Sequence, residues 1–324
     1  MKNDYVRLAD RINEIYELDL EPHTESRAFV KLFNKMLSAR DAAIASRLDD
    51  HLRPASYITD VMGIDEASAE RALRKMARKG IIFEHKEDSI YTYKLMPFVP
   101  GIFEALVHES GDPEISAFLK EYTEEVAQIA AEEILIPVNS KIEIKTETVP
   151  FEEISVYLDN SKDYAVMDCM CRTIHATQGD ACGHPIKDMC ILIGSSVDYY
   201  VRTGKARKAS RTEIESILRK AESAGLVHEM YPMNKTDSIF ICNCCPCGCM
   251  FMGLSRRIHS VVTYEGAVHI DSAKCSRCGI CVSRCPEQVF GWSVSGDGIS
   301  VDSRRCFECG MCKLFCPDKA ITIG

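Results

Sequence analysis

The pattern of apolar positions between residues 27 and 95 predicts helices followed by a two-stranded hairpin. Apolar residues recur at helical spacing within Glu66–Lys79, and a turn separates this helix from a shorter one over Pro54–Met62. Gly80 then ends the second helix, because glycine readily takes the left-handed conformation common after helix C-termini. The predicted strands and the charged turn between them are Ile81–Phe83, Ile90–Lys94 and Lys86–Asp88.

This arrangement of residues 1–98 resembles a winged-helix domain. In winged-helix regulators the second helix enters the major groove of DNA. The corresponding helix here carries five basic residues, namely Arg71, Arg74, Lys75, Arg78 and Lys79. However, Glu66 and Glu70 occupy the turns that would approach the bases, and residues 1–98 hold 16 Lys/Arg against 17 Asp/Glu. A docking or dimerisation role is therefore favoured over DNA binding.

The central part of the chain alternates helical and strand patterns. A helical linker, residues 99–136, contains a helix from Pro113 to about Leu135 that either packs domains together or contributes to a homodimer. A half-exposed strand, Lys141–Val149, and a helix, Phe151–Leu158, follow. Two short apolar stretches predict buried strands, and a capping box at Ser210 and Glu213 predicts the start of a helix. Those stretches are Tyr164–Met167 and Ser238–Ile241.

A second copy of the helix–hairpin pattern is indicated by residues at a constant offset. Arg74-Lys75 and Gly80-Ile81-Ile82 correspond to Arg219-Lys220 and Gly225-Leu226-Val227. If the copy holds, the cysteines from Cys242 onward lie at the end of a strand of the second hairpin.

Composition and charge narrow the class of protein. The chain has 324 residues, 46% of them hydrophobic, and a formal net charge of −9, which argues against a nucleic-acid binder as a whole. No apolar run long enough to span a membrane and no signal peptide is seen in the sequence, so we expect a cytoplasmic protein with no membrane insertion. In that reducing compartment the 17 cysteines are expected to bind metal rather than form disulfides.

Eight of these cysteines form two copies of C-x2-C-x2-C-x3-C-P, each with a short strand before and after it. The pattern resembles the bacterial two-[4Fe–4S] ferredoxin family. The resemblance implies a βαββαβ fold, low-potential electron transfer and crossed ligation, in which the fourth cysteine of each motif binds the other cluster. The implied ligand sets are Cys275, Cys278, Cys281 and Cys316 for one cluster, and Cys306, Cys309, Cys312 and Cys285 for the other.

The other nine cysteines form two groups, each just after a predicted buried strand. Strand ends of one sheet can meet, so we predict a third metal centre there, although adjacent Cys244 and Cys245 cannot point the same way in an extended chain. Nine thiols fit one cubane with spares, two cubanes, or a larger cluster. An iron–sulfur centre is favoured because the chain already holds two cubanes, and zinc, with His175 or His184 as a further ligand, is the alternative. The nine candidates are Cys169, Cys171, Cys182, Cys190, Cys242, Cys244, Cys245, Cys247 and Cys249.

The elements Cys169-Met170-Cys171-Arg172 and Cys242-Asn243-Cys244-Cys245 are similar to a cysteine-rich domain that precedes ferredoxin motifs in iron–sulfur proteins of anaerobic bacteria and archaea. The predicted fold is thus an α+β multidomain chain. It comprises a winged helix (1–98), the helical linker (99–136), a cysteine-rich α/β middle domain (137–262) and a ferredoxin-like domain (263–324).

Three functions are consistent with these patterns. The leading one is an electron-transfer protein, or the electron-input subunit of an anaerobic redox complex. Because neither a nucleotide-binding glycine fingerprint nor a P-loop is present, this function requires redox partner proteins. The alternatives are a reductase with substrate chemistry at the middle-domain cluster, where His175, His184 or Asp168 would handle protons, and a redox-responsive DNA-binding regulator.

Overall fold

The N-terminal part of the chain is a group of helices followed by a hairpin, as predicted, but the predicted turn is misplaced because Lys86 and Glu87 belong to the first strand and the turn lies at Asp88 and Ser89. The computed structural model describes residues 3–16, 27–135, 147–148, 151–233, 236–245, 247–250, 268–285, 287–306 and 310–323. Asp65 caps the last of these helices by accepting the N–H of Ser68, and Gly80, with φ of 82°, ends it. The elements are α1 (Asp4–Ile15), α2 (Ala28–Met36), α3 (Ala39–Ala45), α4 (Ala55–Met62), α5 (Glu66–Lys79) and the antiparallel strands β1 (Ile82–Glu87) and β2 (Ile90–Leu95).

Several basic side chains of α5 are engaged within the chain. The ammonium of Lys75 lies 2.7 Å from the buried Asp41 carboxylate, and Lys79 donates to the carbonyl of Met36. Arg74 lies over the Tyr91 ring and 3.9 Å from Glu84. These contacts hold α5 against its own neighbours.

The middle part of the chain is built on a six-stranded sheet of order β3-β7-β8-β5-β4-β6. Every described strand pair in it is antiparallel, so this part is α+β rather than the alternating α/β type we predicted. Of the predicted strand 141–149, residues 141–146 and 149 lie outside the described residues. The strands are β3 (Glu147–Thr148), β4 (Tyr164–Met167), β5 (Cys190–Ile193), β6 (Arg207–Lys208), β7 (Val227–Pro232) and β8 (Ile239–Cys244). The helices are α8 (Phe151–Asn160), α9 (Met170–Thr177), α10 (Val197–Arg202) and α11 (Arg211–Ser223).

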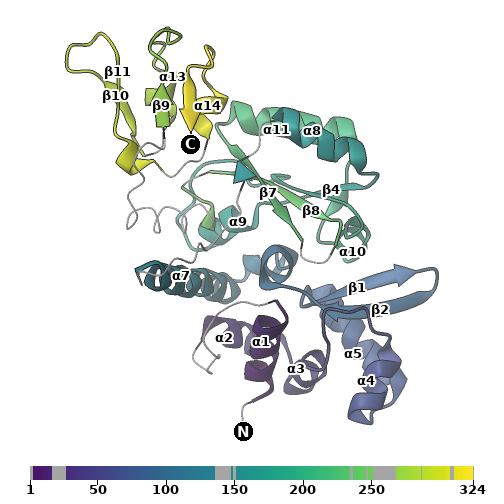
Figure 1. Cartoon of the computed structure of the whole chain (residues 1–324). Helices are drawn as coiled ribbons and strands as arrows, with labels where there is room; N and C mark the ends of the chain where they lie inside the picture. Colours follow the sequence, from purple (N-terminus) through teal and green to yellow (C-terminus); the bar gives the residue numbers. More distant parts are fainter. Residues whose placement is uncertain are drawn as a thin grey trace.

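The predicted second helix–hairpin copy is present as α11, Gly225, β7 and β8. Ser210 accepts the N–H of Glu213 at the start of α11, and Gly225 has φ of 76° at its end. In Figure 1, α8 and α11 lie side by side over one face of the sheet, and the N-terminal helices lie on the other side. Cys242 and Cys244 therefore lie at the end of a hairpin strand, and the later cysteines follow it.

The N-terminal and middle parts share one continuous hydrophobic core. Tyr199 donates to the carbonyls of Ala77 and Ile82 at 2.9 and 3.0 Å, and Lys205 donates to the carbonyl of Arg78 at 2.6 Å. The last turn of α5 is thus tied to the middle part. Between the two parts lie η1 (Phe98–Ile102), α6 (Phe103–Ala105), η2 (Glu109–Gly111) and the predicted long helix α7 (Pro113–Leu135), which packs on α2 and α9.

Glu104 is a buried carboxyl at this junction, and it makes stability depend on pH. Burial raises its pKa to about 8, although its carboxylate accepts the N–H of Gly101 at 2.7 Å. The pKa of Glu104 is higher in the folded than in the unfolded protein. The stability that its protonated carboxyl contributes is therefore complete below about pH 4.5 and is lost as the pH rises toward 8. We expect Glu104→Gln to remove this loss, so that the variant gains roughly 4 kcal/mol over the wild type between pH 5 and 8. Anaerobic thermal unfolding across this range measures the difference, and parallel pH profiles would contradict it.

The C-terminal part has the predicted βαββαβ order. The outer strands β9 and β12 pair with each other, and the inner strands β10 and β11 pair likewise, so that the two halves are related by approximate two-fold symmetry. Figure 1 shows this part against the middle sheet, on the side away from the N-terminal helices. Its elements are β9 (Val268–Ile270), α13 (Ile280–Arg284), β10 (Phe290–Trp292), β11 (Ile299–Val301), η3 (Ser303–Arg305), α14 (Met311–Leu314) and β12 (Ile321–Ile323).

Candidate metal centres

Five of the eight cysteines of the two C-terminal motifs converge on one small core, whereas Cys275 is half-buried and Cys278 is exposed outside it. Cys312 is buried there with Val268, Phe290 and Ile321, and the other members come from both motifs: Cys281, Cys285, Cys306 and Cys316. Cys309 and the motif proline Pro286 lie outside the described residues. The fourth cysteine of each motif accepts a hydrogen bond from the backbone N–H four residues later. Cys285 accepts that of Val289 at 3.4 Å, and Cys316 accepts that of Ala320 at 3.3 Å. Such N–H donors stabilise thiolate charge, which suits cluster ligation.

Six middle-domain cysteines meet at one edge of the sheet. Strands β4 and β8 are both antiparallel to β5, so the ends of β4 and β8 and the start of β5 lie together, with Met167 opposite Cys190 and Cys190 opposite Cys242. Cys169 and Cys171 follow β4, and Cys249 follows β8. We call the six the thiol ring: Cys169, Cys171, Cys190, Cys242, Cys244 and Cys249.

Each thiol of the ring interacts with two others, and the interactions close on themselves. In order around the ring the thiols are those of Cys169, Cys190, Cys242, Cys244, Cys249 and Cys171. Hydrogen bonds from its neighbours lower the pKa of Cys169, and those from Cys190 and Cys244 lower that of Cys242 to about 6. The same bonds raise the pKa values of Cys171, Cys190 and Cys244. Five of these cysteines are buried and Cys242 is half-buried, so their thiols cannot all ionise without a cation among them, and the ring suits a cationic metal group.

A second group, the thiol triad, consists of Cys182, Cys245 and Cys247. Their three sulfur atoms lie within 4.8 Å of one another, and those of Cys182 and Cys245 are 3.7 Å apart. Cys245 is buried whereas Cys247 is exposed, so the triad reaches the surface. A Cβ atom at Gly248 would lie 2.9 Å from the Cys182 sulfur and 3.2 Å from the Cys245 sulfur. Only glycine leaves this space free.

Arg172 lies between the two thiol groups, and its surroundings indicate whether a negatively charged metal group fits there. Its side chain is 2% exposed, and Nη1 donates to the carbonyl of Asn243 at 3.0 Å and to the Cys245 sulfur at 3.5 Å. Its Nε and Nη2 are buried and have no hydrogen-bond partner among the residues that the structure describes. Burial acts to lower the pKa of Arg172, but the charges of Cys169 and Cys245 outweigh it and raise that pKa. A buried guanidinium with free donors beside thiols fits an anionic thiolate-bound metal group.

Other polar residues around the ring were not predicted from the sequence. Glu229 lies opposite Cys242 in the β7–β8 pair, and its carboxyl oxygen is within 4.8 Å of the sulfurs of Cys244 and Cys249. Burial raises the pKa of Glu229 to about 8, and Tyr231 donates to its carboxylate. Only the register of the second hairpin, which pairs Glu229 with Cys242, could have indicated from the sequence that this carboxyl lies beside the thiols.

The two histidines considered as ligands differ in position. The Nδ1 atom of His175 is 2.9 Å from the Asp180 carboxylate, which also binds Lys120 at 3.0 Å, so His175 has a different partner from the thiols. His184 is close enough to Arg172 for that charge, after burial, to lower its pKa. Asp168 accepts the N–H of Asp188 and so braces the loop before β5.

The C-terminal module contacts the thiol ring directly. Met311, next to Cys312, is buried against Val227, Cys244 and Cys249, with Phe315 packed beside it. Arg284 of α13 lies over the Phe315 ring, 4.2 Å from its centre. Side chains of the second motif therefore fill the space next to the ring.

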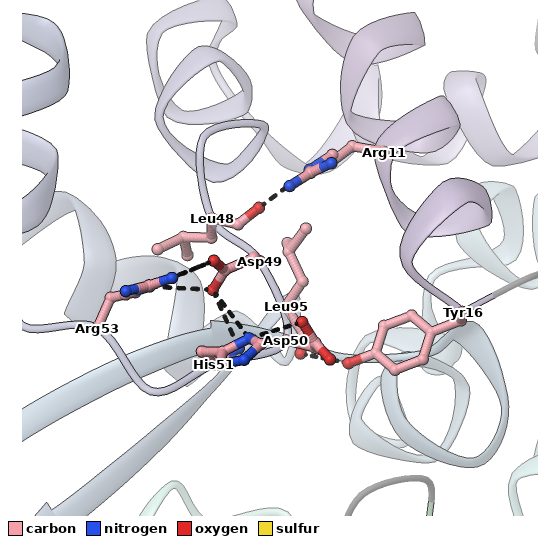
Figure 2. Close-up of polar contacts among 8 residues, drawn as sticks. All are labelled: Arg11, Tyr16, Leu48, Asp49, Asp50, His51, Arg53 and Leu95. Carbon is pink, nitrogen blue, oxygen red and sulfur yellow. Dashed lines mark hydrogen bonds and ion pairs between the residues drawn. The ribbon is translucent and has the colours of Figure 1, made fainter.

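A third group of possible ligands, Asp49, Asp50 and His51, has a structural explanation. Arg53 binds the Asp49 carboxylate at 2.6 Å, and the Nδ1 atom of His51 lies 2.9 Å from Asp50 (Figure 2). The backbone carbonyl of Asp49 accepts the N–H of Leu95, whose own carbonyl accepts the hydroxyl of Tyr16 at 2.7 Å. These contacts fix the loop between α3 and α4 to strand β2.

Comparison with known families identifies one part of the chain. Residues 274–321 match the family model of the 4Fe–4S dicluster domain, so the C-terminal module is a domain of this class with two [4Fe–4S] clusters. No curated protein and no solved structure matches the chain. Among the residues that the structure describes, none of the helices has the length and apolarity needed to cross a membrane.

Proposed function

We propose that the chain is an iron–sulfur electron-transfer protein, or the electron-input subunit of a redox complex, in which the dicluster domain exchanges electrons with a third iron–sulfur centre held by the thiol ring. The observation that carries the proposal is the burial of Met311, beside a cysteine of the dicluster domain, against two cysteines of the ring. Bound iron–sulfur clusters supply one-electron transfer at potentials set by their surroundings.

The chain's own residues define the parts of this arrangement. In the dicluster domain, Cys275, Cys278, Cys281 and Cys316 would hold one cluster, and Cys306, Cys309, Cys312 and Cys285 the other. The ring supplies six thiols at a buried edge of the sheet, where Arg172 offsets negative charge and the packing of Met311 and Phe315 excludes water. Because the dicluster domain lies at the end of the molecule in Figure 1, a redox partner protein has access to it.

The N-terminal part serves, in this proposal, as a winged-helix-like docking element. The last turn of α5 binds Tyr199 and Lys205 of the middle part, and Lys75 and Lys79 are engaged by neighbouring residues. These contacts support docking over DNA reading.

The metal content of the anaerobically purified protein tests the proposal. Two [4Fe–4S] clusters account for eight irons, so a third iron–sulfur centre predicts about twelve or more irons per chain, with matching acid-labile sulfide. Low-temperature EPR of the reduced protein should show a signal beyond those of the dicluster domain. A chain with only about eight irons would overturn the assignment of the ring.

A further inference from the structure

We propose that the thiol triad is a separate site for a single zinc-type divalent ion, with three thiolate ligands and a fourth position open to solvent. The triad is distinct from the ring by its contacts. Cys245 and Cys247 interact with each other and with Cys182, whereas the chain of thiol contacts in the ring closes through six other cysteines. The adjacent residues Cys244 and Cys245 thus serve different sites.

The spacing of the sulfurs indicates one ion rather than a cubane. Tetrahedral zinc with Zn–S bonds of about 2.3 Å places its sulfurs about 3.8 Å apart. The sulfurs of Cys182 and Cys245 are 3.7 Å apart, and all three lie within 4.8 Å of one another. A cubane binds each thiolate through a different iron, whereas a single ion binds all three. Among the described cysteines of the dicluster domain, no three come as close as those of the triad.

The space around the triad is closed on one side and open on the other. Gly248 and Arg172 line the closed side, where a Cβ at position 248 would lie 3.0 Å from Cγ of Arg172. The positive charge of Arg172 balances the net negative charge of a divalent ion with three thiolates. On the other side Cys247 is exposed, and within the described residues the triad gathers no fourth cysteine, histidine or carboxylate. Three protein ligands with an open position are typical of zinc that binds water or an exogenous thiolate.

Metal analysis of cysteine variants tests this site separately from the ring. We expect one zinc per chain in the wild type, and at least a tenfold lower zinc occupancy in Cys182→Ala and Cys247→Ala, with iron unchanged. Zinc-edge X-ray absorption of the wild type should show three sulfurs at about 2.3 Å and one lighter ligand. Four sulfurs would overturn the open position. A loss of about four irons in these variants would show a cubane instead, and unchanged metal would show that the triad binds none.

A glycine pair keeps the test valid if the cysteine variants fold poorly. Gly248 lacks the positive φ that strains other residues, so Gly248→Ala acts by filling the space beside the two sulfurs and Cγ of Arg172, and it should release zinc at least tenfold faster to a chelator. Gly183→Ala, next to Cys182, strains the loop at φ of 79° but meets nothing within 4 Å, and should retain zinc. Equal zinc loss from both variants would contradict the site. The iron content of the same samples reports on the ring, so failure of one proposal is distinguishable from failure of the other.

Discussion

Replacement of Cys242 by alanine should remove the iron of the middle-domain centre and leave the eight irons of the dicluster domain in place. Cys242 lies between Cys190 and Cys244 in the ring and opposite both Cys190 and Glu229 in the sheet. Loss of its sulfur removes one ligand and interrupts the ring. The remaining thiols then lack the metal that would balance their charge. We expect the total to fall from about twelve or more irons to about eight. The additional EPR signal should disappear while the dicluster signals remain.

The matched control for this variant is Cys247→Ala. It also removes one middle-domain thiol, but that thiol is exposed and belongs to the triad and not to the ring. Iron should therefore stay at the wild-type level in this control. If Cys242→Ala keeps its full iron content, or if both variants lose the same amount, the ring does not hold a centre of its own.

Two clusters could be predicted from the eight C-terminal cysteines because their spacing along the chain is itself the requirement for binding a cubane, and the family match over residues 274–321 confirms a dicluster domain. The strands on either side of each motif were predicted from the flanking sequences that the two motifs share, and the structure confirms them as β9 to β12. The convergence of the middle-domain cysteines was also predictable in outline, since the predicted buried strands Tyr164–Met167 and Ser238–Ile241 are each followed by cysteines. Because β4 and β8 are both antiparallel to β5, their ends do meet.

The division of nine cysteines into a ring and a triad could not be predicted from spacing alone. Side chains two apart on a strand share a face, so Cys242 and Cys244 enter the ring together, and Cys245 turns to Cys182 instead. That partner is supplied by the loop between α9 and β5, whose course depends on tertiary contacts such as the Asp168–Asp188 bond. The contact between Met311 and the ring depends on how two domains pack, and no local pattern encodes it.

Arg172→Met should lower the reduction potential of the middle-domain centre by roughly 90 mV. The guanidinium is buried next to Cys169, Cys190 and Cys245, and its positive charge would stabilise the more negative, reduced state of the proposed cluster. At an effective dielectric constant of about 20, one charge roughly 8 Å away contributes about 2 kcal/mol. For a one-electron couple this corresponds to about 90 mV, since 59 mV is a tenfold change in the equilibrium constant.

An EPR-monitored redox titration measures this shift, and the dicluster potentials in the same sample are an internal reference. Arg172→Lys retains a positive charge but lacks the planar group that binds both the Asn243 carbonyl and the Cys245 sulfur, so its potential should lie between those of the wild type and Arg172→Met. If the two variants shift the potential equally, the hydrogen-bond geometry of Arg172 matters more than its charge. A buried charge beside a cluster must change the reduction potential of that cluster. If neither variant shifts the potential while both retain iron, Arg172 therefore has only a structural role.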